Sequence, residues 1–189
     1  MKKNYEMDMC SGPILGKLLT FTIPLIFSGI LQLLFNAADV IVVGRFAGSQ
    51  SLAAVGSTTA LINLMINIFI GLSVGVNVIV ARYYGAKREK DVQDTIHTAM
   101  ALSIVSGLFL IVMGQLLSRP MLELMGTPDD VIDKSTIYMR IIFIGMPANM
   151  IYNFGSAILR AVGDTKRPLY FLTAAGVINV VLNLFFVIM

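Results

Sequence analysis

Long uncharged stretches alternate with short charged ones along this chain. The uncharged stretches cover residues 18–38, 46–81, 95–118, 141–159 and 168–189. A helix needs about 20 apolar residues to cross a bilayer, and only helices or closed barrels can do so, because backbone polar groups in lipid must bond internally. Barrel strands would be about ten residues long and would alternate, which these stretches do not. The pattern predicts an all-α, polytopic membrane helical bundle with spans at about 14–43, 52–82, 93–118, 135–159 and 168–189.

The composition agrees with a membrane protein. Apolar residues make up 57% of the chain and charged residues 13%, and the mean hydropathy is +0.82. Soluble domains normally carry about 25% charged residues. We therefore expect a short N-terminal segment, residues 1–13, followed by one membrane unit, residues 14–189, with the lipid bilayer as its first partner.

The basic residues indicate an orientation. The N-terminal segment and the second and fourth loops hold ten of the 14 lysines and arginines: Lys2, Lys3, Lys17, Arg82, Lys87, Arg88, Lys90, Arg160, Lys166 and Arg167. The positive-inside rule then places the N-terminus and these loops in the cytoplasm. Since these residues alternate with membrane spans and form no single patch, no nucleic-acid partner is expected.

Polar residues recur at helical spacing within the spans, as residues that line a shared cavity would. The alternative is that their amides join neighbouring membrane helices, as small and amide side chains commonly do. The residues concerned are Gln32, Asn36 and Asp39 in the first span, Asn149 and Asn153 in the fourth, and Asn179 and Asn183 in the fifth.

Asp39 lies deep in an apolar run with no other charge between Lys17 and Arg45. A carboxylate at the centre of a span costs about 2.5–3.5 kcal/mol on insertion scales, so a functional role is the default hypothesis. Burial disfavours the charged form of a carboxyl group, whereas a bound cation favours it. We therefore expect Asp39 to exchange a proton or a Na⁺ ion, with a structural carboxyl group as the alternative.

Other residues limit the kinds of structure and site that the chain can contain. Pro24 lies in the same span as Asp39 and predicts a kink, either a fixed bend or a hinge. Cys10 is the only cysteine and His97 the only histidine, so no internal disulfide and no cysteine–histidine metal cluster can form. No nucleophile–base pair or phosphate-binding loop occurs in the sequence, and we expect neither an enzyme nor a bound cofactor.

Three segments together resemble the MATE (multidrug and toxic compound extrusion) family. The first, 23-IPLIFSGILQLLFNAADVIVVGRFAGSQSLAAVG-56, is similar to the family's first helix and following loop, with a turn at Gly44. The second, 157-AILRAVGDTKRPLY-170, resembles the signature between helices four and five. The third, 178-INVVLN-183, resembles the start of the polar face of helix five.

The resemblance implies a fold and a set of site residues. Family members have twelve helices in two lobes, so this chain would be helices one to five of the N-terminal lobe, and the remainder of the same polypeptide would be its partner. The family's cation site would correspond to Asp39, Asn179 and Asn183, although some members have a second acid at the position of Asn183. Tyr138 and Asn153 match helix-four polar residues near that site, and Pro24 matches a proline linked to bending of helix one.

The resemblance also implies a function. We expect a cation-coupled antiporter, driven by H⁺ or Na⁺, that expels small organic, often cationic, drugs by alternating access across the bacterial inner membrane. One alternative is a lipid-linked precursor or polysaccharide flippase, which would need basic residues on cavity faces that here are predicted to carry none. The other alternative is a non-transporting membrane scaffold. In the "GDTKRP" loop, Asp164 or Thr165 is expected to cap the next helix.

Overall fold

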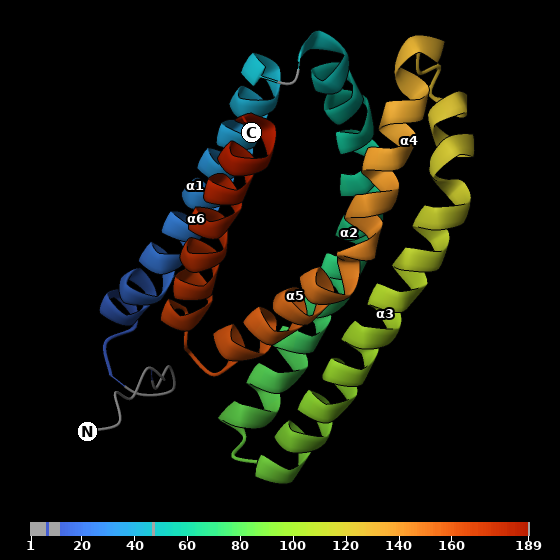
Figure 1. Cartoon of the computed structure of the whole chain (residues 1–189). Helices are drawn as coiled ribbons and strands as arrows, with labels where there is room; N and C mark the ends of the chain where they lie inside the picture. The colour runs from blue at the N-terminus through green and yellow to red at the C-terminus, as the bar shows by residue number, and fades with distance from the viewer. Residues whose placement is uncertain (1–6, 8–11, 47, 189) are drawn as a thin grey trace.

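The computed structural model describes residue 7 and residues 12–46 and 48–188, so most of the N-terminal segment, including Cys10, lies outside the described residues. In that part of the chain every regular element is an α-helix (Figure 1). The helices are α1 (Ile14–Phe46), α2 (Gly48–Gly85), α3 (Glu89–Leu124), α4 (Asp129–Ile144), α5 (Met146–Ala161) and α6 (Lys166–Ile188).

Five membrane spans are present if α4 and α5 are counted as one. Each of α1, α2, α3 and α6 is long and apolar enough to cross a membrane by itself. The first three extend beyond the predicted ends. In particular, α1 continues through Gly44, so the turn expected there is wrong, and the positive φ of +83° falls at Gly48 instead. The protein is therefore a multi-pass membrane protein.

The fourth span is broken, which the sequence pattern did not predict. α4 and α5 meet at Gly145 with a bend of 48°. Pro147 stands in the first turn of α5, where its missing N–H costs no helical hydrogen bond. The bend brings Pro147 against Gly107 of α3 so closely that a Cβ at residue 107 would overlap the proline ring.

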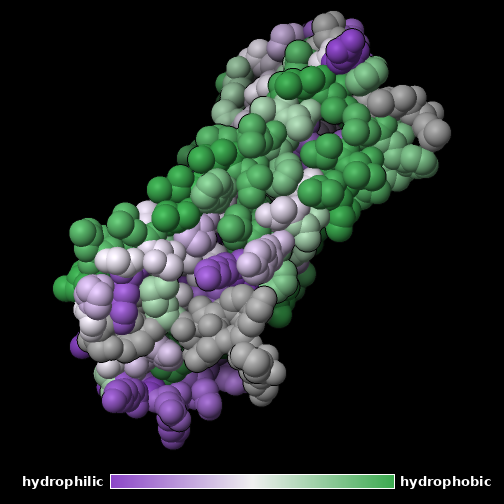
Figure 2. Space-filling model, turned by 90° about the vertical axis from the view of Figure 1, so that its left-hand side faces the viewer, coloured by the Kyte–Doolittle hydropathy of each residue, from purple (hydrophilic) through white to green (hydrophobic). Residues whose placement is uncertain are grey.

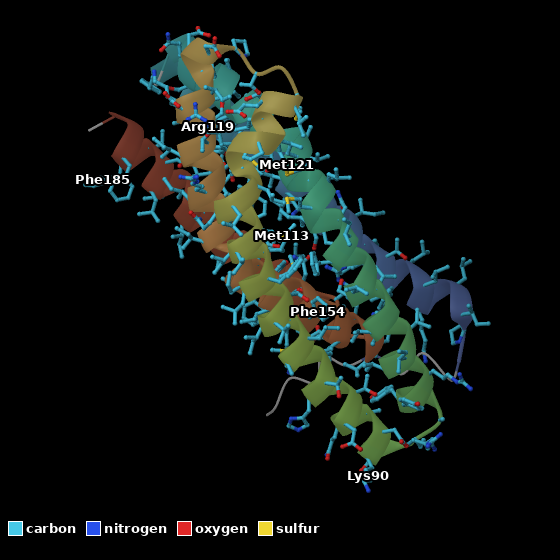
Figure 3. All side chains as sticks on the ribbon, turned by 90° about the vertical axis from the view of Figure 1, so that its right-hand side faces the viewer. Lys90, Met113, Arg119, Met121, Phe154 and Phe185 are labelled. Carbon is cyan, nitrogen blue, oxygen red and sulfur yellow. The ribbon has the colours of Figure 1, made fainter. Side chains whose placement is uncertain are left out.

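The helices form two groups. One group contains α2, α3, α4 and α5, which pack on one another; the other is the pair α1 and α6, which contacts the first through α2 and α5 (Figure 1). The core lies within the four-helix group, where Phe154 is among the side chains that point inward (Figure 3). Its fully buried members include Leu110, Met139, Phe143, Met150 and Phe154.

Two ends of the bundle can be distinguished. The start of α1, the α2–α3 connection and the start of α6 lie at one end, and the α3–α4 connection and the end of α6 lie at the other (Figure 1). Lys90 and Arg119 mark these opposite ends of α3 (Figure 3). The two loops predicted to share a membrane face, α2–α3 and α5–α6, therefore do lie at one end together with the start of α1, and we call this the basic end.

An apolar surface covers the middle of the bundle. Figure 2 shows a hydrophobic band across the face formed by α1 and α6, with hydrophilic residues gathered mainly at the basic end. Only Pro24 and Val42 of α1 are buried. Many of the other apolar side chains of this helix are exposed, among them Ile26, Leu33 and Ile41.

Candidate functional site

Asp39 faces α6 because α1 and α6 approach closely one turn before it. Phe35 packs against Gly176, where a Cβ would overlap the phenylalanine ring. Asp39 follows Phe35 by four residues, and Asn179 and Asn183 follow Gly176 by three and seven, so all lie on the facing sides of the two helices. The glycine thus brings the carboxylate within reach of the two amides.

Asn183 and Asn179 are the hydrogen-bond partners of the Asp39 carboxylate. The Asn183 side-chain nitrogen donates to Asp39 Oδ1 at 2.5 Å. The Asn179 amide, with its nitrogen turned toward the carboxylate, donates to Oδ1 at 2.8 Å and lies 3.3 Å from Oδ2. The structure therefore brings together the three residues expected to bind the cation.

The Asn179 amide also lies 3.4 Å from the Asn183 side-chain nitrogen. With its nitrogen toward Asp39 it supplies a donor to the carboxylate, whereas the opposite orientation would place two acceptors against each other.

The oxygen atoms at this site suit a hard cation. Hard cations prefer carboxylate, carbonyl and water oxygens, and Asp39 with the two amides supplies such atoms. Asp39 and Asn183 are half-buried, and Asn179 is exposed, which leaves room for further ligands. In the part of the chain that the structure describes, no group of three or more His, Cys, Asp or Glu side chains gathers to hold a metal ion.

The remaining predicted residues near Asp39 are more loosely placed. Tyr138 is half-buried on α4 and packs against the hydrophobic core, and its part in the Asp39 site stays a prediction. Gln32 and Asn36 are exposed on α1. They lie on the same face of the helix as Asp39, but on the opposite side of Asp39 from Phe35. They contact neither amide of α6 through a described hydrogen bond, so their role in lining a cavity stays a prediction.

A second feature lies toward the basic end, where α1, α2 and α5 enclose a cavity of about 230 Å³. We call it the α1–α2–α5 cavity. Asn153 lines it and donates from its side-chain nitrogen to the backbone oxygen of Asn149 at 2.9 Å and to Asn149 Oδ1 at 2.7 Å, whereas its predicted place near the Asp39 site stays a prediction. Asn149 itself is exposed and is not part of the cavity wall.

Arg160 also lines this cavity, which corrects the expectation that cavity faces carry no basic residue. The sequence pattern predicts Arg160 in a loop, where it bears only on orientation. It belongs instead to the last turn of α5. Because it follows Asn153 by seven residues and Ala157 by three, it lies on the same face of the helix. That spacing was the signal that could have identified it.

The loop after α5 is held by Asp164. Its Oδ1 accepts the backbone N–H groups of Lys166 and Arg167, each at 3.1 Å, and its Oδ2 lies 3.2 Å from Arg167 Nε. The side chain is fully buried. The predicted N-cap is therefore confirmed for Asp164, and it fixes the start of α6 at the basic end.

The fold and these polar groups define a class: a multi-pass helical membrane protein with a carboxylate–amide cluster between two of its spans. The MatE family model matches residues 24–185, and the chain belongs to this family.

Relatives and solved structures of this family are similar over most of the chain. The probable multidrug resistance protein YoeA of Bacillus subtilis is 36% identical over 86% of the chain and 35% of its own length. The FAD transporter of Shewanella oneidensis is 27% identical over 93% of the chain and 38% of its own length. A multidrug resistance MATE family transporter of the MOP superfamily, solved in an outward-facing conformation, superimposes with a TM-score of 0.82 at 26% identity, over 89% of this chain and 37% of that one. The chain thus spans little more than a third of the length of each.

Proposed function

We propose that this chain is the N-terminal lobe of a cation-coupled antiporter that expels organic, often cationic, compounds by alternating access. The observation that carries the proposal is the Asp39 carboxylate held by the amides of Asn179 and Asn183 inside the membrane spans. Family membership and relatives described as multidrug resistance proteins support it. We also propose that the protein lies in the bacterial inner membrane with its N-terminus in the cytoplasm, and that the remainder of the same polypeptide completes the transporter.

In the proposed cycle, Asp39 takes up a proton or a Na⁺ ion from outside. The charged carboxylate accepts hydrogen bonds from amide N–H groups, whereas a protonated carboxyl group or a bound cation interacts with amide oxygens. The hydrogen bonds between α1 and α6 therefore change when the ion binds. Pro24 interrupts the hydrogen-bond ladder of α1 and lets the two halves of the helix change their angle. Coupling requires only that ion and drug have different affinities for the two conformations.

The test is ion-driven efflux from vesicles that contain the full-length protein. A pH gradient or a Na⁺ gradient is imposed, and efflux of a fluorescent organic cation is followed for wild type and Asp39→Asn. Asp94→Asn is the matched control, because Asp94 is an exposed acid at the basic end of α3. We expect one gradient to drive efflux, Asp39→Asn to abolish it, and Asp94→Asn to retain it.

The result also separates the alternatives. Efflux that survives in Asp39→Asn would make the carboxyl structural and refute ion coupling at this site. A membrane scaffold predicts no gradient-driven efflux by any variant. A flippase for lipid-linked anions predicts transport of a phosphate-bearing substrate rather than of a cation.

A further inference from the structure

We propose that the α1–α2–α5 cavity binds the anionic head group of an amphipathic molecule, a phosphate or a carboxylate, through Arg160. The cavity lies toward the basic end, whereas Asp39 lies 14 residues beyond Leu25 on α1, which is about 21 Å along the helix at 1.5 Å per residue. The two sites share no lining residue, so binding at the cavity can be tested apart from the ion-coupling role of Asp39.

Among the described residues that line the cavity, Arg160 has a buried nitrogen without a hydrogen-bond partner. Its Nε is buried and has no hydrogen-bond partner among the described residues. No described carboxylate lies within the 4.0 Å that an ion pair requires, whereas the nearby Arg167 is paired with Asp164. Buried polar groups in proteins almost always have partners, and an exception calls for a ligand or another explanation.

The neighbouring amides already bond to the protein, which leaves Arg160 as the charged donor for a ligand. Asn77 donates from its side-chain nitrogen to the backbone oxygen of Ala157 at 2.7 Å and so joins α2 to α5. The Asn153 amide donates twice to Asn149. These bonds fix the wall, and the planar guanidinium is the side chain best suited to bind phosphate or carboxylate through two parallel hydrogen bonds.

The other walls are apolar and favour an amphipathic ligand. Phe21 and Leu25 of α1 face the cavity one turn apart, and Ile70 and Val74 of α2 do the same. A volume of about 230 Å³ is smaller than the roughly 300–1,000 Å³ of pockets that enclose a drug-sized ligand. The cavity therefore suits a head group and the first part of an apolar chain.

Arg160 has one alternative explanation that involves no ligand. A cation in the last turn of a helix is stabilised by the helix dipole, and a long basic side chain can extend along apolar surface to reach water. Both effects operate when the guanidinium is in solvent. They do not account for a buried Nε without a described hydrogen-bond partner in a residue that lines the cavity.

The test measures binding to the purified full-length protein in neutral detergent, by the shift of its thermal unfolding midpoint. Octyl phosphate is compared with octyltrimethylammonium, and added phosphatidylglycerol with added phosphatidylcholine. We expect the anionic probe of at least one pair to raise the midpoint, and Arg160→Gln to weaken that effect about tenfold or more in half-saturating concentration. Arg82→Gln is the matched control, because Arg82 is an exposed arginine in the last turn of α2 and lies outside the cavity.

The two pairs of probes identify the source of the head group. A response to phosphatidylglycerol alone assigns the site to a membrane lipid, and a response to octyl phosphate assigns it to a soluble amphipathic anion. The proposal is overturned if wild type does not distinguish anionic from cationic or zwitterionic probes, or if Arg160→Gln responds like Arg82→Gln.

A second measurement leaves Arg160 intact in case the substitution impairs folding. Val74→Cys, made in a Cys10→Ser background, places a thiol on the cavity wall for labelling with a maleimide. The anionic probe should slow labelling, whereas octyltrimethylammonium should not. An equal labelling rate with and without the anion would also overturn the proposal.

Discussion

Gly176→Ala perturbs the point where α1 and α6 approach most closely around the Asp39 site. The added methyl group would overlap the ring of Phe35 on α1. Because an aromatic ring at a helix interface cannot give way without a rotamer change or a helix shift, the substitution should separate the two helices or displace the ring. Asn183 lies seven residues further along α6 and would move with it.

The two energy terms of this substitution have opposite signs. Alanine is favoured over glycine inside a helix by about 1 kcal/mol. Overpacking a fitted contact costs typically about 1–3 kcal/mol, and this overlap involves the ring itself. Taking about 2–3 kcal/mol for this overlap, we expect a net loss of about 1–2 kcal/mol, which corresponds to a few degrees in the unfolding midpoint at about 2–4 °C per kcal/mol.

The assay is thermal unfolding of the detergent-solubilised protein together with efflux from vesicles. Gly29→Ala is the matched control on α1, because a Cβ there would meet nothing within 4 Å. It should keep or slightly raise the midpoint, whereas Gly176→Ala should lower it and reduce efflux. Phe35→Leu combined with Gly176→Ala should recover part of the stability. A Gly176→Ala protein as stable as Gly29→Ala would refute the packing on which the geometry of the site depends.

Substitutions at three further positions test the basic end and the broken span. Asp164→Ala removes two backbone N–H bonds of a buried cap and should lower the unfolding midpoint through a loss of about 1–2 kcal/mol, whereas Asp164→Asn, also a good N-cap, should lose less. Gly163→Ala should cost about 1–3 kcal/mol by the same measurement, because residue 163 has a φ of +86° and its Cβ would press on the backbone of Met7. Gly107→Ala should force Pro147 away from α3 at a cost of about 1–3 kcal/mol, and an unfolding midpoint that does not fall would contradict the packing.

The spans and the Asp39 cluster could be predicted because each depends on spacing along the sequence. Uncharged length alone locates the membrane helices. Asp39 stands out as the single acid in its span, and Asn179 and Asn183 share a helix face because they are four residues apart. That these two faces meet depended on the family resemblance and not on the residues themselves.

The break in the fourth span and the role of Arg160 could not be predicted in the same way. Hydropathy does not register whether a helix is continuous, and glycine and proline are common in membrane helices, so Gly145 and Pro147 gave no clear signal. The bend is supported by Gly107 on another helix, which is a tertiary contact. Arg160 lies where a span meets a loop, and element ends are the least certain part of any prediction from sequence.

The Asp39 site and the α1–α2–α5 cavity are connected through α1. Near Asp39 the helix is held mainly by α6, through the Phe35–Gly176 contact and the two amides. Pro24, one of only two buried residues of the helix, lies between Phe21 and Leu25, which line the cavity. Proline weakens the helix at that point, because its nitrogen has no hydrogen to donate. An ion that changes the α1–α6 contact therefore acts on a helix whose other half forms one wall of the cavity, and a change of angle at Pro24 would alter that wall's position relative to Arg160. Occupancy of the two sites would then be coupled without any direct contact between them, and the coupling would be reciprocal.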